Sequence, residues 1–484
     1  MTQNLKLKVL STEEVTTIYE KCLSFLSNKG VKAHHSQVLT ILDKGGAWVD
    51  FDNKQVRFPR DVIESALGQV PRSLTLAGRG ESRDLIIPHP NGTFYTASNT
   101  GATSYLDPDS ITYRGVTQAD AQEWAQLMQK LDGIDICAFP TLADVPGQVA
   151  DIYALRTYFE NTSKHIWVQP HSAESVEYLF RLALTVAGSE DALKKRPIIS
   201  VCANSLTPLE ILEMDLEVIH RASQYGIPIY LCALPSAGGT SPVTIAGTVL
   251  LSSIELLAMV VMSQLIEPGT PVFCGHHRLT LDMATGRSLM TSVEAILGEV
   301  ASSQFIQEAF QVPTFSWGYG TDSHIPDGQS MIDGTLLGMK VALAGTDILE
   351  GAGGLDVCLA ISPLQLIIDN TRASIFKRMC SGVKVDDDTL AWDEILASVP
   401  GGNFLEQPHT LRHCREAVRL GLFNYQPREI WSSEGGKDLY TRVLDNYKNL
   451  KKGLQPLGLS EDVRKEMDLI VQQAHERFAG RKIV

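Results

Sequence analysis

Short apolar runs alternate with helix-like stretches through the middle of the chain. Eight such runs occur, at intervals of roughly thirty to forty-five residues. They are FYTASNT (94–100), IDICAFP (134–140), HIWVQP (165–170), IISVCANS (198–205), IPIYLCALP (227–235), PVFCGHH (271–277), TFSWGYGT (314–321) and DILEGAGG (347–354). Strand–helix alternation predicts a parallel sheet with crossover helices, and eight units favour a closed (β/α)8 barrel over an open sheet.

The pattern changes on both sides of this region. STEEV, which begins at Ser11, predicts a helix with acidic residues in its first turn, and further helices and one short strand follow before residue 90. After Gly382 the strand pattern stops. Four helical stretches remain: DTLAWDEILASV, HTLRHCREAVRLGL, GKDLYTRVLDNYKNLKKGL and SEDVRKEMDLIVQQAHERFAG. The predicted division is an N-terminal, mainly helical extension (1–90), an α/β barrel (91–381) and a C-terminal helical extension (382–484).

The longest apolar stretch, residues 244–266, approaches the length of a membrane span. It contains Ser252, Glu255 and Gln264, so we expect a buried helix and no membrane association. The N-terminus shows no apolar signal core, and the eight cysteines form no Cys-x-x-Cys pair. Reduced cysteines in the cytoplasm are the expectation.

Composition and charge narrow the class of protein. Hydrophobic residues make up 44% and charged residues 20% of the 484 residues, as in ordinary globular proteins. The formal net charge of −14 would repel phosphate backbones, so we expect no nucleic-acid partner.

Polar residues gather where the predicted barrel strands end, which is where barrel enzymes place their chemistry. Together these residues predict a polar pocket, but none forms a recognisable nucleophile–base pair. They are Asn99, Gln169, His171, Asn204, Ser205, His276, His277, Tyr319, Asp322, His324 and Glu350.

Aromatic residues alternate with small residues in the seventh run. Period two would place Phe315, Trp317 and Tyr319 on one face of the strand. These rings either pack between sheet and helices or stand at a cavity mouth, where Trp167 and Tyr230 from neighbouring strands would join them. Aromatic faces attract quaternary ammonium cations by ~0.5–2 kcal/mol per ring.

Two features suggest a metal or a cofactor, and we expect neither to be bound. Adjacent His276 and His277 point to opposite faces of a strand, and the mid-strand cysteines are better explained as small apolar fillers. The segment from Asp322 to Gly328 nearly matches the Asp-x-His-x-x-Gly motif of cobalamin-binding domains. However, Asp327 stands where that motif needs Gly, so we expect this chain to hold no corrinoid of its own.

Three segments resemble the trimethylamine methyltransferase family of corrinoid-dependent enzymes. They are GYGTDSHIPDGQSMIDGTLLGMKVALAGTDILEGAGGLDVCLAISPLQLIIDN (318–370), SAGGTSPVTIAGTVLLSSIELLAMVVMSQLIEPGTPVFCG (236–275) and GGNFLEQPHTLRHCREA (401–417). The resemblance implies a (β/α)8 barrel that transfers a methyl group to the Co(I) of a separate corrinoid protein. The corrinoid would then be supplied by that partner.

One departure from the family bears on the substrate. The archetype carries pyrrolysine, whereas this chain has only standard residues. Members without pyrrolysine that resemble this chain act on quaternary amines, and glycine betaine, which would yield dimethylglycine, is the first candidate. The rings would then hold the cation. His276, His277, His324 and Asn204 would bind a substrate carboxylate, and Asp322 and Glu350 would offset charge or orient a histidine.

Two other functions and the assembly state stay open at this point. A zinc-dependent methanol or thiol methyltransferase uses a similar barrel, and a non-catalytic barrel could dock a corrinoid protein without turnover. A homo-oligomer is compatible with the sequence, which does not determine the number of copies.

Overall fold

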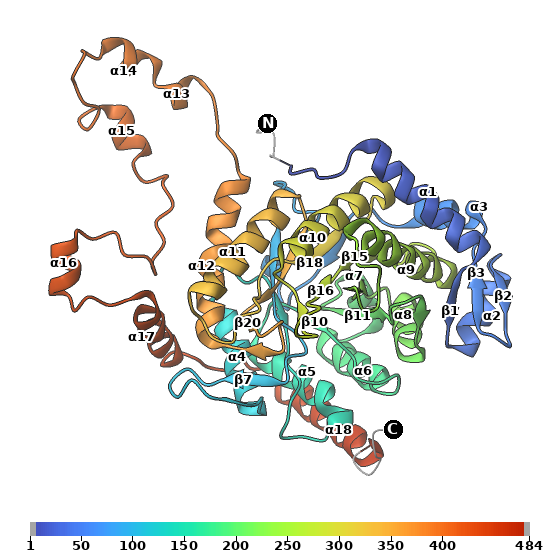
Figure 1. Ribbon diagram of the computed structural model, residues 1–484. Coiled ribbons are helices and arrows are strands. Elements are labelled where there is room, and N and C mark those ends of the chain that lie inside the picture. The colour runs from blue at the N-terminus through green and yellow to red at the C-terminus, as the bar shows by residue number, and fades with distance from the viewer. Residues whose placement is uncertain (1–5, 479–484) are drawn as a thin grey trace.

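Eight parallel strands close into a barrel in the computed structural model, which describes residues 6–478 (Figure 1). Each of the eight predicted runs supplies one strand, and neighbours in sequence are neighbours in the barrel. The strands are β6 (Tyr95–Ser98), β9 (Ile136–Ala138), β10 (His165–Val168), β11 (Ile199–Ser205), β13 (Ile229–Ala233), β15 (Val272–His276), β18 (Thr314–Trp317) and β19 (Ile348–Ala352). The predicted fold class is confirmed.

Helices connect the strands and cover the outside of the barrel. They are α4 (Gln118–Lys130), α5 (Ala150–Asn161), α6 (Ser175–Ala187), α7 (Glu190–Lys195), α8 (Glu213–Tyr225), α9 (Ile245–Ile266), α10 (Val293–Phe305), α11 (Gly328–Leu343) and α12 (Pro363–Cys380). Helix α9 is the apolar stretch noted in the sequence. It is the single described helix with the length and hydropathy of a membrane span, and most of its apolar window is buried inside the fold.

The N-terminal extension adds a small layer against this barrel and closes one of its ends. Its elements are α1 (Thr12–Asn28), β1 (Val31–Ala33), α2 (Ser36–Lys44), β2 (Trp48–Asp50), β3 (Gln55–Arg57), α3 (Arg60–Gln69), β4 (Leu74–Leu76) and β5 (Leu85–Ile87). Side chains of the β4–β5 hairpin pack with the inward-facing barrel side chains in one apolar cluster. The barrel interior is therefore filled at that end, and any cavity must lie at the other end.

Loop strands surround the opposite, carboxyl end of the barrel. One small sheet joins β7 (Ser104–Leu106) and β8 (Tyr113–Gly115) with β20 (Gly354–Leu355) and β21 (Ala360–Ile361). Another joins β14 (Ser236–Ala237), β16 (Leu279–Leu281) and β17 (Ser288–Leu289), while β12 (Glu210–Ile211) extends the N-terminal sheet. These loops form the walls around the barrel mouth.

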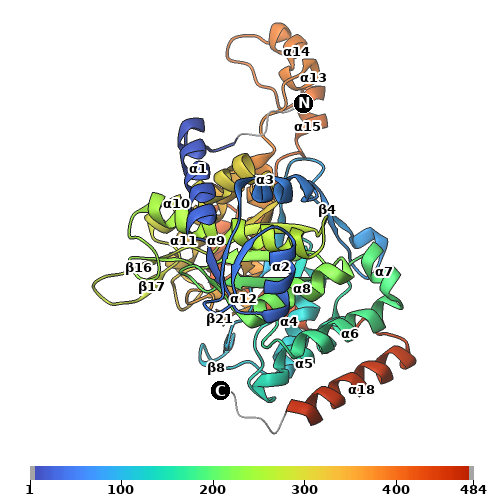
Figure 2. The same cartoon turned by 90° about the vertical axis from the view of Figure 1, so that its right-hand side faces the viewer.

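The C-terminal extension has two different parts. Helices α17 (Leu439–Lys451) and α18 (Glu461–Phe478) pack against barrel helices. Between α12 and α17, residues 382–436 form an arm that carries α13 (Asp387–Leu390), α14 (Trp392–Ala397), α15 (Pro408–His413) and α16 (Arg428–Ser433). The first part of the arm, which carries α13, α14 and α15, stands clear of the barrel in both views (Figures 1 and 2).

The helix predicted from HTLRHCREAVRLGL is much shorter than expected. It covers only Pro408–His413, and none of its side chains is buried. A short helix without tertiary packing is marginally stable in water. Because α15 packs no side chain against the rest of the fold, it does not extend over the whole predicted stretch. The division into three domains stays a prediction, although the barrel strands all fall between residues 95 and 352.

Candidate active site at the mouth of the barrel

A cavity of about 270 Å³ lies at the carboxyl ends of the barrel strands. Its wall combines aromatic rings, amide side chains and one carboxylate from seven of the barrel strands and the loops that follow them. The lining residues are Asn99, Thr100, Gly101, Trp167, Gln169, Cys202, Asn204, Tyr230, Leu234, His277, Trp317, Glu350, Gly351, Val357, Cys358 and Leu359. Its position is the one at which barrel enzymes bind their substrates.

Glu350 is the acidic group of this cavity. It is 2% exposed, and its carboxylate accepts a hydrogen bond from the Tyr230 hydroxyl over 2.6 Å and contacts His277 Nε2. Burial, and secondarily the Glu350 charge, raise the pKa of Tyr230 well above its usual value. The phenol therefore stays protonated and donates to Glu350. Two partners therefore hold the Glu350 carboxyl group in a fixed position beside the cavity.

The rings form a continuous aromatic wall around Glu350. The indole of Trp317 stacks on the imidazole of His277, and Tyr230 packs against Trp167 with ring centroids 4.4 Å apart. Phe315 stacks on Tyr230 from within the barrel but does not line the cavity. Trp167, Tyr230 and Trp317 present faces of high electron density, which attract cations.

Amide side chains occupy another part of the wall. The Cys202 thiol donates to Asn204 Oδ1 over 3.3 Å, and in the described part of the chain the Asn204 amide nitrogen has no protein partner. Gln169 likewise makes no side-chain hydrogen bond among the described residues. Gly101 has a φ of +65°, and a Cβ there would stand 2.9 Å from Gln169 Oε1. Glycine at this position therefore leaves room for the Gln169 amide.

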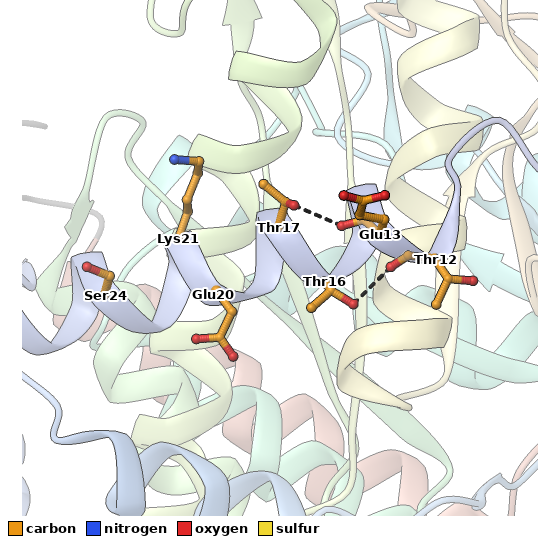
Figure 3. A pocket seen from close by; sticks show the side chains of 7 residues that line it. All are labelled: Thr12, Glu13, Thr16, Thr17, Glu20, Lys21 and Ser24. Atoms are coloured by element: carbon orange, nitrogen blue, oxygen red, sulfur yellow. Dashed lines mark hydrogen bonds between the residues drawn. The ribbon is translucent and has the colours of Figure 1, made fainter.

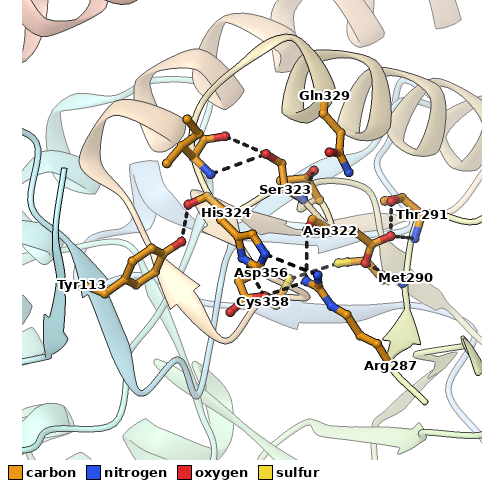
Figure 4. A network of polar contacts seen from close by, with 12 residues as sticks. Tyr113, Arg287, Met290, Thr291, Asp322, Ser323, His324, Gln329, Asp356 and Cys358 are labelled. Carbon is orange, nitrogen blue, oxygen red and sulfur yellow. Dashed lines mark hydrogen bonds and ion pairs between the residues drawn. The ribbon is translucent and has the colours of Figure 1, made fainter. Parts of the chain in front are cut away.

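The roof of the cavity is a short turn between β20 and β21. Asp356, Val357 and Cys358 all have left-handed backbone conformations, with φ of 52°, 56° and 63°. Such a conformation costs about 1–3 kcal/mol for a residue with a side chain and persists only where its surroundings hold it. Asp356 accepts a 2.7 Å hydrogen bond from Arg287 Nη2 (Figure 4). Asn99 Nδ2 donates to the Cys358 carbonyl over 2.9 Å.

Two predicted site residues face away from the cavity. His276 points outward from the barrel, where its Nδ1 lies 2.6 Å from Ser252 Oγ of α9, within hydrogen-bond distance, and burial lowers its pKa to about 3. Tyr319 lies beyond the end of β18 and packs on Phe376 of α12, with its hydroxyl 3.1 Å from Thr96 Oγ1. The prediction that His276 and Tyr319 line the cavity was wrong. The ring of Tyr319 packs between the barrel and a helix, which was the other possibility stated for the rings of this strand.

Asp322 and His324 also lie outside the cavity. The Asp322 carboxylate accepts hydrogen bonds from the backbone amides of Met290 and Thr291, over 3.0 and 2.9 Å, and thereby fixes the loop before α10. The His324 side chain is 61% exposed and sits 3.2 Å from Asp356 in the network behind the roof (Figure 4). Neither side chain lines the cavity, because the loop turns toward solvent after Asp322, and the predicted role of these two residues toward the substrate stays a prediction.

The mid-strand cysteines divide between the two faces of the barrel. Cys137 and Cys274 pack outside with the helices, whereas Cys202 and Cys232 face inward. Among the residues that the structure describes, no group of three His, Cys, Asp or Glu side chains converges as a metal site. Sequence reasoning missed Cys202 as a cavity residue, since a thiol that orients Asn204 has no sequence signature.

A second hollow, of about 800 Å³, lies along one face of α1 (Figure 3). It differs from the barrel cavity because all its side chains come from a single helix and two of its three threonine hydroxyls are already hydrogen-bonded. Thr16 and Thr17 donate to the carbonyls of Thr12 and Glu13 within the helix. The hollow therefore does not bring together reactive side chains from different parts of the fold. Its residues are Thr12, Glu13, Thr16, Thr17, Glu20, Lys21 and Ser24.

The family model of trimethylamine methyltransferases matches residues 2–479, which is nearly the whole chain. This chain belongs to the trimethylamine methyltransferase family. The trimethylamine methyltransferase of Desulfitobacterium hafniense is 30% identical over 470 residues, covering 97% of this chain and 94% of that protein. The glycine betaine methyltransferase of strain Y51 of the same species is 28% identical over 434 residues, covering 89% of each. The overall sequence identities are therefore too similar to distinguish trimethylamine from glycine betaine as the substrate.

The fold of this trimethylamine methyltransferase family member is similar to that of a solved structure. The monomethylamine methyltransferase of Methanosarcina barkeri superimposes with a TM-score of 0.52, covering 93% of this chain and 89% of that one, at 11% identity. At that identity the likeness supports the barrel fold and carries no residue roles. The cavity residues of this chain must be interpreted from their own geometry.

Proposed function

We propose that this methyltransferase moves a methyl group from a small quaternary amine, with glycine betaine as the first candidate, to the Co(I) of a separate corrinoid protein. The observation that carries the proposal is the composition of the cavity wall. One part of the wall can bind a cation and is built from Trp167, Tyr230, Trp317 and Glu350. The amide NH₂ groups of Gln169 and Asn204 line the same 270 Å³ cavity. A betaine has both matching groups, a quaternary cation and a carboxylate.

The aromatic wall and Glu350 suit a permanently charged ammonium group. Such a group has no N–H to donate, so it gains little from hydrogen-bond acceptors and much from ring faces and a nearby carboxylate. Because Tyr230 and His277 hold the Glu350 carboxylate, little reorganisation is needed when the cation enters. The cavity lies just below the usual size range for sites of drug-sized ligands, which favours a small substrate.

The amides supply donors for the other end of the substrate. Asn204 Oδ1 is occupied by the Cys202 thiol, which turns its NH₂ group toward other partners. Gln169, next to Gly101, offers a second NH₂ group on the cavity wall. Two amide donors can hold a carboxylate without adding positive charge that would repel the ammonium group.

The reaction needs positioning more than acid–base catalysis. The cobalt nucleophile would attack the methyl carbon with its electron pair, while the breaking C–N bond leaves its pair on nitrogen. The products would be a methylated cobalt and dimethylglycine with a neutral tertiary amine and its carboxylate, with no proton transferred. The chain's own task would be to hold the methyl group in line with the acceptor and to exclude water.

The corrinoid in this proposal belongs to the partner and enters as a co-substrate. Asp322 and His324, which nearly match a cobalamin motif, are engaged in loop contacts behind the roof. Such a partner would approach the open mouth of the barrel, because the β4–β5 hairpin fills the other end.

A direct assay tests the proposal. The purified chain is mixed with a reduced corrinoid protein and, in turn, glycine betaine, proline betaine, carnitine and trimethylamine, while the absorbance of methyl-cobalt is followed. Methylation with a betaine and little with trimethylamine is expected, because a neutral tertiary amine leaves far more readily than an amide anion. Comparable rates with trimethylamine, or no methylation with any of the three betaines, would contradict the proposed substrate.

A further inference from the structure

A buried carboxyl group on α10 joins the two strand ends that carry the stacked rings of Trp317 and His277. Glu299 is fully buried, and its Oε1 accepts a 2.5 Å hydrogen bond from the backbone amide of Arg278. Its Oε2 accepts a hydrogen bond from the Ser316 hydroxyl. Arg278 directly follows His277 in the sequence, and Ser316 directly precedes Trp317. One side chain therefore holds the immediate neighbours of both stacked residues.

The pairing of β15 with β18 explains why these two contacts reach the stack. His276 and Ser316 are partners in the parallel ladder, and both side chains point outward, toward α9 and α10 respectively. Successive side chains of a strand alternate between its faces, so His277 and Trp317 come next on the inner side, next to each other. Helix α10 packs on both strands, which brings Glu299 to their outer face at this point (Figure 1).

The strand ladder alone does not fix the position of His277. Strand β15 ends at His276, and the backbone amide of His277 donates to the Ala233 carbonyl of β13 over 2.8 Å. The next amide, that of Arg278, has Glu299 as its acceptor. A buried backbone amide beyond the end of a sheet needs a partner from elsewhere, because an unpaired one costs free energy. Glu299 thus continues the support of this segment past the end of the barrel strand.

The residue before Glu299 accommodates the side chain of Arg278. That side chain is buried and lies against Gly298, where a Cβ would stand 1.8 Å from Arg278 Nη1. Glycine at this position therefore lets α10 pack close to the segment that follows β15. Two consecutive residues of one helix thus contact Arg278, one at its backbone and one at its side chain. These contacts limit the movement of His277, which precedes Arg278 by one peptide bond.

Other outer helices also place buried carboxyl groups at strand ends. Asp215 of α8 accepts a 2.7 Å hydrogen bond from the Asn204 amide, and Asp369 of α12 accepts one of 2.7 Å from the Gly353 amide. Each of these two contacts holds the end of one strand. Glu299 differs because its two oxygens hold two neighbouring strand ends, and the residues next to these contacts stack on each other.

We propose that Glu299 is a positioning residue for cation binding, which acts by holding Trp317 and His277 in their stacked arrangement. Glu299 does not line the cavity, so it acts on a ligand only through these two residues. A ring attracts a cation through its face, and a rotated indole presents less of that face. Binding groups must be held to within ~0.5 Å and ~10–20°, which requires support from behind. The inference rests on the proposed function only for the identity of the cation.

Fluorine NMR of protein that contains 5-fluorotryptophan tests the arrangement without any ligand. The chain has six tryptophans, and the Trp317 resonance is the one that disappears in Trp317→Phe. Glu299→Met removes both hydrogen bonds and should displace this resonance while leaving that of Trp124, on α4, in place. Glu299→Gln should leave it near its native position, because the Gln oxygen can accept from the Arg278 amide and the NH₂ group can donate to the Ser316 hydroxyl. An equal displacement in both variants would overturn the proposal, since the hydrogen bonds could not then be the cause.

A matched control and a milder variant complete this test. Asp347→Leu removes another buried carboxyl group, which binds Thr314 at the opposite end of β18, and should not displace the Trp317 resonance. If Glu299→Met does not fold, as judged by circular dichroism, Ser316→Ala removes one of the two hydrogen bonds and should displace the resonance instead. An unchanged Trp317 resonance in the folded variant, or an equal displacement in Asp347→Leu, would contradict the positioning role.

Affinity measurements connect the arrangement to ligand binding. Calorimetric titration with tetramethylammonium should show a loss of about two- to tenfold in Glu299→Met, since the ring is displaced but not removed. In a Trp317→Leu background the same substitution should add almost nothing, because the ring through which Glu299 acts is absent. Full additivity of the two losses would overturn the proposal. If the native chain binds no quaternary ammonium ligand, the proposed function fails, while the fluorine spectra still decide whether Glu299 positions the stack.

Discussion

The indole of Trp317 and the imidazole of His277 lie parallel, with 1° between their planes and 4.4 Å between their centroids. This stack joins the aromatic wall of the cavity to its acidic group, because His277 also contacts Glu350. Trp317 is therefore placed both to face a ligand cation and to hold His277 in position. Tyr319, only two residues later, has neither contact.

Replacing Trp317 with Leu should weaken the binding of betaines and other quaternary ammonium ligands. The expected loss is ~0.5–2 kcal/mol, or about two- to thirtyfold in Kd, because one ring face is removed. Tyr319→Leu should instead lower the thermal midpoint and leave the Kd near its native value, since Tyr319 packs against α12. Calorimetric titration and thermal unfolding of both variants check this pair. Normal affinity in Trp317→Leu would show that this ring only packs.

Glu350→Gln should weaken cation binding while leaving the shape of the cavity unchanged. At an effective dielectric constant of about 20, charges roughly 5 Å apart attract by about 3 kcal/mol, so a loss of at least about tenfold is expected. The control ligand is 3,3-dimethylbutyrate, in which carbon replaces the quaternary nitrogen of glycine betaine. Its affinity should stay unchanged or rise in the variant. An equal loss for both ligands would mean that Glu350 acts by holding Tyr230 and His277.

The barrel could be predicted because its signal is local and repeated. Each strand is a short apolar run followed by a helical stretch. This order indicates a parallel sheet, and the count of eight units favours a closed barrel. The shape of the arm could not be predicted in the same way. A helix does form around Leu411, as its pattern predicts. Its length, however, depends on tertiary packing, and none of its side chains is buried.

Cavity residues could be predicted within the strands, where side chains alternate between the two faces, but not beyond the strand ends, where this alternation stops. The opposite orientations of His276 and His277 follow from period two, but only the contacts of His277 with Tyr230 and Glu350 show that His277 is the one that faces the cavity. Alternation placed Tyr319 with Trp317, yet β18 ends at Trp317 and Gly320, with a φ of +99°, turns the chain. The hydrogen bond between Cys202 and Asn204 likewise depends on side-chain geometry that no spacing rule encodes.

The stability of Asp347→Asn relative to the native protein should depend on pH. Burial raises the pKa of Asp347 to about 6, while its carboxylate accepts hydrogen bonds from the Thr314 amide and hydroxyl over 2.8 and 3.0 Å. The folded state thus binds this proton more tightly than the unfolded chain, whose Asp has a pKa of about 3.9. The native protein should lose free energy of unfolding relative to the variant as pH rises from about 4 to about 6, by about 3 kcal/mol. Urea unfolding at a series of pH values measures this difference, and a difference that does not change with pH would contradict the raised pKa.

Gln169→Ala and Asn204→Ala should each weaken glycine betaine while sparing ligands without a carboxylate. A hydrogen bond to a charged group contributes about 1.5–3 kcal/mol, so each variant should lose about ten- to a hundredfold in affinity for glycine betaine. Choline shares the trimethylammonium group but has a hydroxyl in place of the carboxylate, and its affinity should change little. Gly101→Ala, whose Cβ would meet Gln169 Oε1, should reproduce the Gln169→Ala pattern. If all three variants weaken choline as strongly as glycine betaine, these residues shape the cavity and the substrate carboxylate binds elsewhere.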